Sequence, residues 1–422
     1  MRYFLLACLT SLYLLLVGCN GAADGSNLIN PTSTPTPTSA PISGTNVAAL
    51  VVDSGPAGAT GVVNIPYVTV KVCVPGSTTC VTVDHVLVDT GSTGLRLMSS
   101  ALGGLALPVQ NTPTGASIPG VPTAECYKFA DGFIWGSVAK ADLTIGGESA
   151  SGVQLQVIGD SNFPTVPTGC SSGGTNEGTV ADFGANGVIG VANIVHDCGD
   201  TSNVCATTAN PDFYYACASG STCQPTSMPT ANQVVNPVTL FATDNNGVMI
   251  VMPAVGSSGA VTATGSLVFG IGTQSNNALS GVTQYPTSIV GDVYIGVNTV
   301  SGMGFFDTGS NLLFLPSSVA AACPSGTNSA GPDFFCPTTT VNPVIAIAGY
   351  NSSMSPSSSI TLSIASANTL FASNNRAFSN VGGPNSLSEI DLGFPFNYGR
   401  SFYLGFNTNT STNTATPGYV AF

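Results

Sequence analysis

One short string occurs twice in this chain and constrains the fold more than any other feature. Each copy is an apolar run that reaches Asp-Thr-Gly-Ser and then returns to apolar residues; the copies span Val86–Leu95 and Gly304–Leu313. Glycine permits a tight turn, and the Thr and Ser hydroxyls can bond a carboxylate, so each copy predicts a loop that holds an aspartate. A long-range duplication of such a loop predicts two similar lobes.

The duplicated string resembles the two active-site loops of pepsin-like aspartic peptidases, two-lobed β proteins in which each lobe supplies one catalytic aspartate. Those proteins carry an apolar-apolar-glycine string beside each loop, and Gly187–Ala192 and Asp391–Phe396 match it here. The resemblance extends from about residue 47 to residue 422. It implies an all-β, bilobal, pepsin-like (acid protease) double barrel with an active-site cleft between the lobes. As a whole, the chain is also similar to a family of uncharacterised bacterial lipoproteins.

The resemblance implies a role for each residue of the two loops. Asp89 and Asp307 would be the catalytic pair. The supporting residues would be Thr90, Gly91, Ser92, Thr308, Gly309 and Ser310. The threonines would brace the loops against each other across the lobe interface, and the serines would hold the carboxylates through hydrogen bonds.

Two aspartates on facing loops supply acid–base chemistry without a cofactor. Like charges a few Å apart do not both ionise easily, so the pair shares a proton. The ionised carboxylate would take a proton from water while the protonated one hydrogen-bonds the scissile carbonyl. We therefore predict an aspartic endopeptidase acting on peptide or protein substrates. The alternative is a non-catalytic lipoprotein of the same fold, acting as a binding or inhibitor module at the cell envelope.

A hairpin in the first half resembles the flap that closes over substrate in pepsin-like enzymes. Two strand-like segments flank its tip at Ala130–Gly132. The usual flap tyrosine falls on Phe129, or on Tyr127 if the register slips by two residues, and its usual tryptophan partner falls on Arg96. A further departure is Phe394, where the family often has Asp. An ordinary surface hairpin is the competing interpretation.

The first residues predict export and lipid attachment. Residues 1–19 combine a basic start, an apolar run and Leu16-Val17-Gly18-Cys19, which is typical of a bacterial lipoprotein signal. Residues 20–46 are rich in Pro, Thr and Ser and predict an extended tether. We expect lipidation of Cys19 and a location in the cell envelope, at the outer membrane or the periplasmic face, with membrane contact through the lipid only. An ordinary signal peptide or a short anchor is the alternative.

The cysteine count favours disulfides. Ten of the twelve cysteines follow the signal, and an even number in an exported chain indicates pairing. Closeness in sequence gives four pairs and leaves a fifth; these are Cys73–Cys80, Cys198–Cys205, Cys217–Cys223, Cys323–Cys336 and Cys126–Cys170. Metal binding is the competing interpretation, but the chain has two histidines and no Cys-x-x-Cys, so no metal is expected.

Charge and periodicity complete the outline. A net charge of −13, with 7 Lys+Arg against 20 Asp+Glu, argues against nucleic-acid binding. Alternating Val- and Thr-rich segments predict strands, and no long segment with a 3.6-residue period predicts a helix. We expect an N-terminal lobe at 47–274, a C-terminal lobe at 275–422, and a monomer. A Cys-rich insertion at 195–232 would border the cleft or decorate the surface.

Overall fold

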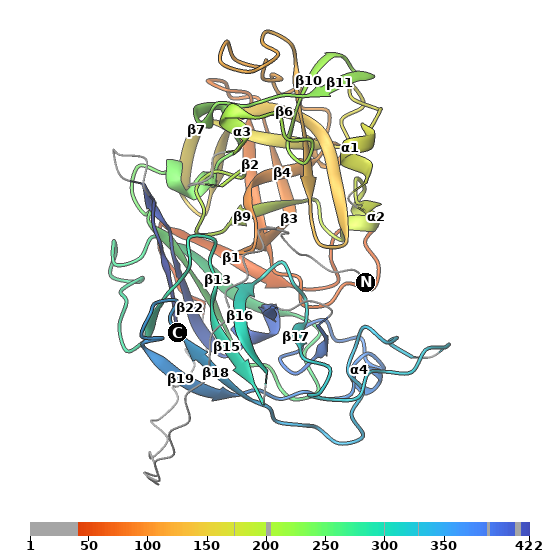
Figure 1. The fold of residues 1–422 in the computed structure, drawn as a ribbon, viewed down its shortest axis with the longest axis vertical. Coiled ribbons are helices and arrows are strands. Elements are labelled where there is room, and N and C mark those ends of the chain that lie inside the picture. Colours follow the sequence, from red (N-terminus) through yellow and green to blue (C-terminus); the bar gives the residue numbers. More distant parts are fainter. Residues whose placement is uncertain are drawn as a thin grey trace, which may run out of the picture.

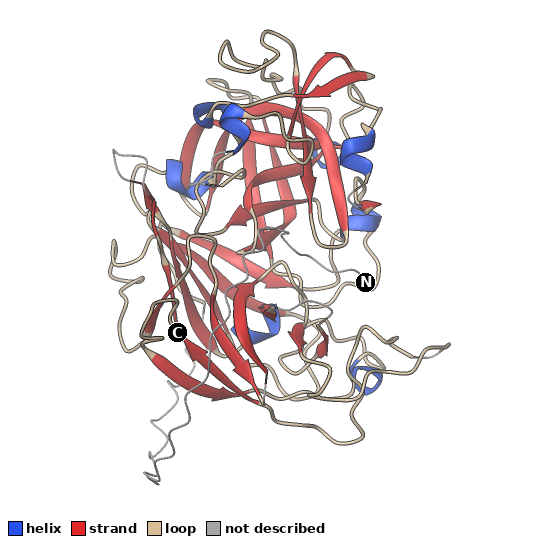
Figure 2. Ribbon diagram, in the orientation of Figure 1, coloured by secondary structure: helices blue, strands red, loops and turns tan. Residues whose placement is uncertain are grey.

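The structure is a computed structural model that describes residues 41–172, 174–199, 204–298, 300–327, 329–385, 389–409 and 415–422. The predicted signal with Cys19, and the tether up to residue 40, lie outside the described residues. Strands dominate, as Figure 2 shows. The helices in the described part are short, as expected: α1 (Thr168–Ser171), α2 (Val180–Phe183), α3 (Val204–Thr207), α4 (Ala367–Leu370), and the 3₁₀ turns η1 (Ser99–Leu102), η2 (Thr230–Asn232), η3 (Pro237–Leu240) and η4 (Phe394–Asn397). None of these helices is long and apolar enough to cross a membrane.

Six strands of the first half close into a barrel around the first Asp loop. The strands are β2 (Tyr67–Cys73), β3 (Cys80–Asp89), β4 (Thr93–Met98), β6 (Gly132–Ile145), β7 (Glu148–Ile158) and β9 (Gly187–Val191). They pair in the order β2, β3, β9, β4, β7 and β6, and β6 pairs back to β2. In β2 the alternating pattern works as expected: Val68, Val70 and Val72 are buried, while Thr69 and Lys71 are exposed.

A group of six strands joins the two lobes. The strands are β1 (Val47–Val52), β12 (Gly247–Met252), β13 (Ala263–Phe269), β14 (Gln284–Pro286), β22 (Arg400–Gly405) and β25 (Tyr419–Ala421). From β2 the sheet continues through β1, β13, β12, β22, β25 and β14. Figure 1 shows β1, β13 and β22 crossing the middle of the molecule. Because these strands come from both ends of the chain, both halves contribute to one shared sheet.

The second Asp loop lies in a separate seven-stranded sheet. Its order is β19, β18, β15, β16, β21, β17 and β20. The bounds are β15 (Val293–Val297), β16 (Val300–Asp307), β17 (Leu313–Leu315), β18 (Val344–Ala348), β19 (Ser357–Thr361), β20 (Gly382–Pro384) and β21 (Ile390–Gly393), with a small separate pair β23 (Thr408–Asn409) and β24 (Ala415–Thr416). The barrel and this sheet form the upper and lower lobes in Figure 1, so the all-β, bilobal fold is confirmed.

The same strand arrangement surrounds both Asp loops. Strand β3 runs parallel to β9 with Asp89 opposite Gly190, and β16 runs parallel to β21 with Asp307 opposite Gly393. In the first lobe, β4 follows the loop and pairs antiparallel with β9. In the second lobe, β17 follows the loop and pairs antiparallel with β21. Glycine is needed at this place, since a Cβ on Gly393 would lie 2.0 Å from the carbonyl oxygen of Leu312. The duplicated string therefore encodes a duplicated local structure.

The flap hairpin is larger than the sequence predicted. Its two strands are β5 (Thr123–Lys128) and the start of β6, and short β8 (Thr175–Asn176) pairs with β6 near the tip. The Cys-rich insertion adds β10 (Tyr214–Ser219), which pairs with β5, and β11 (Thr222–Pro225), which pairs with β10. We call β5, β6, β10 and β11 the flap sheet. The insertion therefore extends the flap rather than standing apart from it.

All five predicted disulfides form, and two of them tie the flap sheet together. Cys217–Cys223 links β10 to β11, and Cys126–Cys170 links β5 to α1. The others are Cys73–Cys80, Cys198–Cys205 and Cys323–Cys336. The flap sheet is therefore held by covalent bonds as well as by strand pairing.

Candidate active site

The two Asp loops meet at the lobe interface through their threonines. Thr90 N–H donates to Thr308 Oγ1 at 3.0 Å, and Thr308 N–H donates to Thr90 Oγ1 at 2.9 Å. Each hydroxyl in turn donates across the interface, Thr90 to the Phe306 carbonyl at 2.9 Å and Thr308 to the Val88 carbonyl at 2.7 Å. Both threonines are buried. These reciprocal bonds hold the loops as one unit, which is the bracing that the resemblance implied.

Each carboxylate is held by its own loop in the same way. It accepts one backbone N–H on Oδ1 and one serine hydroxyl on Oδ2. The four bonds are Gly91 N to Asp89 at 2.7 Å, Ser92 Oγ to Asp89 at 2.5 Å, Gly309 N to Asp307 at 2.8 Å and Ser310 Oγ to Asp307 at 3.0 Å. The structure thus brings all eight predicted loop residues into one site.

The two carboxyl groups face each other at close range. They lie within hydrogen-bonding reach, and Asp89 and Asp307 are only 2% and 4% exposed. A Cβ on Gly91 would lie 2.7 Å from Asp307 Cγ, and one on Gly309 would lie 2.8 Å from Asp89 Cγ, so each glycine admits the opposite carboxyl. Burial, followed by the charges of Asp89 and Asp391, raises the pKa of Asp307 well above its ordinary value. The pair therefore retains a proton where an isolated aspartate would be ionised.

Of the two candidate flap residues, Tyr127 is the one that contacts Arg96. Its ring centroid lies 3.6 Å from the guanidinium carbon of Arg96, and the side chain is buried. Burial is the main cause that raises the pKa of Tyr127, and the charge of Asp89 contributes. Phe129, two residues on, packs its ring 5.2 Å from Tyr127 and 5.8 Å from Phe183. A cation therefore contacts the ring of Tyr127 at the position where the resemblance implied a tryptophan.

Arg96 belongs to a buried polar cluster that sequence reasoning missed. Its Nη2 lies 2.7 Å from Glu125 Oε1 and 3.4 Å from Asp197 Oδ2. Tyr214 on β10 donates its hydroxyl to Asp197 at 2.7 Å. Burial, followed by the neighbouring Glu125, raises the pKa of Asp197. The available signal was a charged residue inside the otherwise apolar string Leu95–Met98, because an arginine buried in a strand requires partners.

A third buried carboxyl group lies behind the pair, and the sequence analysis gave it no role. Asp391 on β21 is 2% exposed, and its Oδ1 has no hydrogen-bond partner. The hydroxyl of Ser310 lies near it and lowers its pKa in part, against the larger effect of burial. Burial raises the pKa of Asp391 well above its ordinary value. The signal was present in the sequence, since Asp391 occupies an expected apolar position of the string that ends at Gly393.

A family model described as "Protein of unknown function (DUF3443)" matches residues 43–422. The chain belongs to the DUF3443 family. A comparison with curated proteins found no match. Among solved structures, the chain is similar to an aspartic proteinase from Irpex lacteus, with 17% sequence identity, a TM-score of 0.45, and coverage of 88% of this chain and 97% of that chain. The segment matched to DUF3443 contains both Asp loops, the flap sheet and Asp391.

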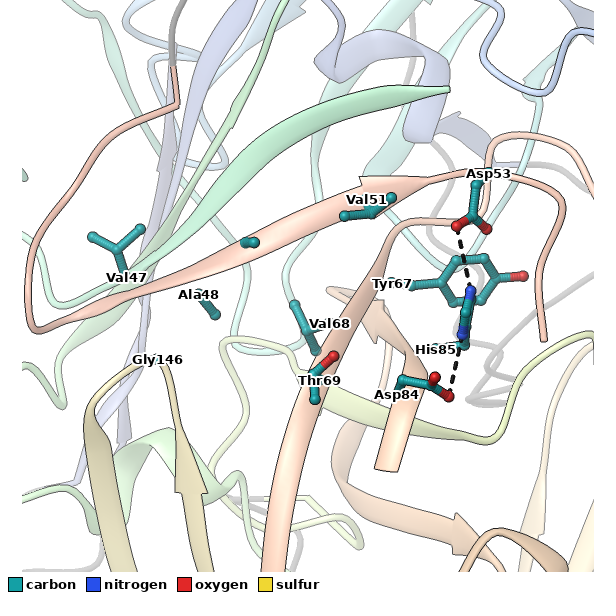
Figure 3. Close-up of a pocket in the computed structure, with 11 residues that line it drawn as sticks. Val47, Ala48, Val51, Asp53, Tyr67, Val68, Thr69, Asp84, His85 and Gly146 are labelled. Carbon is teal, nitrogen blue, oxygen red and sulfur yellow. Dashed lines mark hydrogen bonds and ion pairs between the residues drawn. The ribbon is translucent and has the colours of Figure 1, made fainter. Parts of the chain in front are cut away.

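One surface cavity of this DUF3443 member lies outside the site. It has a volume of about 290 Å³ and is lined by parts of β1, β2 and β3 (Figure 3). His85 lies between two carboxylates there, with Nε2 3.3 Å from Asp53 Oδ2 and Nδ1 3.2 Å from Asp84 Oδ1. The lining contains no Ser or Cys and none of the loop residues. Both ring nitrogens of His85 lie against carboxylates rather than against the hydroxyl of Thr69, which also lines the cavity. This arrangement does not make an acyl-transfer triad, so the cavity is not the candidate site.

Proposed function

We propose that the protein is an aspartic endopeptidase that hydrolyses peptide bonds through Asp89 and Asp307. One observation carries the proposal: two buried carboxyl groups lie within hydrogen-bonding reach of each other, on loops braced by reciprocal threonine bonds. Such a pair offers a general base and a general acid at one point, which is what direct attack by water on an amide requires.

The environment of each carboxyl assigns its role. Asp307 carries the shared proton, because burial and two neighbouring carboxylates favour its neutral form. Asp89 is then the base, and its charge is supported by Gly91 N–H and Ser92 Oγ. Water attacks the scissile carbonyl carbon, giving one proton to Asp89 while Asp307 gives its proton to the carbonyl oxygen. As the C–N bond breaks, the amine nitrogen takes the proton from Asp89 and Asp307 recovers one from the diol.

The test is loss of hydrolysis on removing either carboxylate. Asp89→Asn and Asp307→Asn should each lower cleavage of a diverse peptide pool by orders of magnitude, with the double variant hardly worse, because the two groups act as one unit. Asp244→Asn is the matched control, since Asp244 is equally buried but bonds Gln274 away from the loops. A folded wild-type protein that cleaves nothing between about pH 3 and pH 7 refutes the proposal.

A non-catalytic binding or inhibitor module is the second candidate. It is favoured by the covalent tie between β5 and α1 and by the low exposure of both aspartates. On this alternative, wild type shows no hydrolysis, and partner binding survives both Asp→Asn substitutions.

An anchored location is part of the proposal, supported by the string that ends at Cys19. Cys19→Ala should move the protein out of the membrane fraction of the producing cell. Unchanged fractionation and migration of the variant would reject lipidation.

A further inference from the structure

A short segment between β1 and β2 bonds to the chain on both sides of the lobe interface, next to each Asp loop. The Pro66 carbonyl accepts the N–H of Val88, one residue before Asp89, at 2.9 Å. Asn64 donates its side-chain Nδ2 to the Asn311 carbonyl at 3.1 Å. Asn311 directly follows the second Asp-Thr-Gly-Ser string. The segment therefore joins the start of the first loop to the end of the second, separately from the threonine bonds.

Asn64 uses its whole side chain on the second half of the chain. A side-chain amide can donate two hydrogen bonds and accept two. Besides Asn311, Nδ2 donates to the Phe378 carbonyl at 3.0 Å, and Oδ1 accepts Phe378 N–H at 2.7 Å and the Tyr398 hydroxyl at 3.1 Å. The reversed amide would place its oxygen against both carbonyls, so the partners fix the orientation. Asn64 is fully buried with all four of its side-chain bonds made.

The segment is stiff where it passes from one lobe to the other. Asn64 has a φ of +53°, a left-handed conformation that asparagine adopts more readily than most residues. The ring of Pro66 fixes its own φ and disfavours a helical conformation at Ile65. Val63 belongs to an apolar cluster whose other buried members lie at 312–381, whereas Ile65 packs against a cluster of the first half. Both lobes therefore hold this segment by packing as well as by hydrogen bonds.

We propose that Asn64 is a positioning residue of the candidate site, which sets the distance between the Asp89 and Asp307 carboxyl groups by fixing the second Asp loop to the segment that bonds the first. The threonine bonds join the loops at their centres. Asn64 adds a second attachment, which opposes rotation of one loop against the other. The inference rests on the proposed peptidase function for its effect on hydrolysis, but its effect on the two carboxyl groups does not depend on that function.

The activity test is Asn64→Gly. Glycine keeps the left-handed φ and the backbone N–H bond to the Arg376 carbonyl, and it removes all four side-chain bonds. We expect kcat to fall about tenfold with KM nearly unchanged, because the reacting groups move while the substrate contacts stay. The two limbs of the pH profile should approach each other by about one unit, since repulsion between the carboxyl groups weakens with distance. Asp391 and Tyr127, the other titratable groups near the pair, are unchanged in this variant.

Asn277→Ala is the matched control. Asn277 is also fully buried and makes four side-chain hydrogen bonds, but all of its partners lie within residues 269–274. We expect this variant to lose stability and to keep the kcat and pH profile of wild type. If it narrows the pH profile as much as Asn64→Gly does, the effect is general destabilisation and the inference fails.

Asn64→Ser is the milder variant, for use if the glycine variant does not fold. A hydroxyl can satisfy one of the freed partners but cannot bond all of them. We expect the same changes in kcat and pH profile, smaller in size. Wild-type values in a folded Asn64 variant overturn the inference.

A readout without activity separates this inference from the peptidase function. NMR titration of isotope-labelled aspartate gives the two apparent pKa values of the pair, and Asp89→Asn and Asp307→Asn identify the signals. In Asn64→Gly the two values should lie closer together by about one unit. If wild type cleaves nothing and the values still converge, the peptidase function fails and the positioning role stands. If the values do not move, the positioning role fails, whatever the activity.

Wild type alone supplies a further check. Because both Nδ2 protons of Asn64 lie in buried hydrogen bonds between the lobes, they should exchange with solvent far more slowly than those of an exposed asparagine. Exchange as fast as that of an exposed asparagine would contradict the attachment and overturn the inference, whether or not any variant folds.

Discussion

The two lobes hold the same Asp-Thr-Gly-Ser loop in the same register, but different buried polar groups surround it in each lobe. Behind Asp89, the flap side of the first lobe contains the buried cation Arg96, which pairs with Glu125 and Asp197. Behind Asp307, the second lobe contains Asp391, a buried acid without a cation among its described neighbours. The loops set where the two carboxyl groups lie, and their unlike surroundings set which of them keeps the proton.

The lobes also differ in covalent reinforcement. Four of the five disulfides lie in the first half, and two of these hold the flap sheet. The second lobe has one, Cys323–Cys336. Reinforcement therefore gathers in the first half of the chain, at the flap sheet above all.

The largest difference between the lobes should appear when one arginine is removed from each, the fully buried Arg96 or the partly buried Arg400. Arg96→Met leaves two buried acids without their cation and should lower the free energy of unfolding by about 3–5 kcal/mol. Arg400→Met in the second half is the matched control. Arg400 lies 4.5 Å from the Phe396 ring and bonds a backbone carbonyl, so its loss should cost about 1 kcal/mol. If urea unfolding gives the same loss of unfolding free energy for both variants, the two arginines do not differ in the way that we predict.

Removing one disulfide from each lobe should give a smaller difference. Cys126–Cys170 spans 44 residues and Cys323–Cys336 spans 13, so chain-entropy arithmetic gives losses of about 4 and about 3 kcal/mol for the double Cys→Ala variants. Thermal unfolding of the two variants shows which disulfide contributes more to stability. A larger loss for the second-lobe pair would contradict it.

The smallest predicted effect is a pH trend of stability. Because the folded state raises the pKa of Asp391, the stability that this group contributes is complete below its unfolded value, near 4, and is lost as pH rises toward the folded pKa. Relative to wild type, Asp391→Asn should therefore gain stability from pH 4 to pH 7, by about 1.4 kcal/mol for each unit of pKa shift. Urea unfolding at several pH values tests this. A constant difference across the range would show that Asp391 has an ordinary pKa.

The features that could be predicted from the sequence depend on residues that lie close together in the chain. Both Asp loops, their supporting Thr, Gly and Ser residues, the paired glycine strings and the short-range disulfides all follow from residues a few positions apart. The buried cluster was out of reach because Arg96 finds its partners 29 and 101 residues away, on different elements. Strand β10 likewise pairs with β5, and no local pattern specifies that partner. Asp391 was visible, but its apolar context concealed that it is a buried acid close to the Asp307 loop.

The sheet shared by the lobes has a consequence for how the chain reaches this structure. Strand β1 at residues 47–52 pairs with β13 at 263–269, and β25 at 419–421 pairs with β22 and β14. Contacts of such sequence separation close only after a large entropy loss, and they make folding slow. Neither half can complete this sheet alone, so the sheet that joins the lobes is finished only when residues 419–421 have paired with β14 and β22. The connection between the lobes therefore depends on the last strand of the chain.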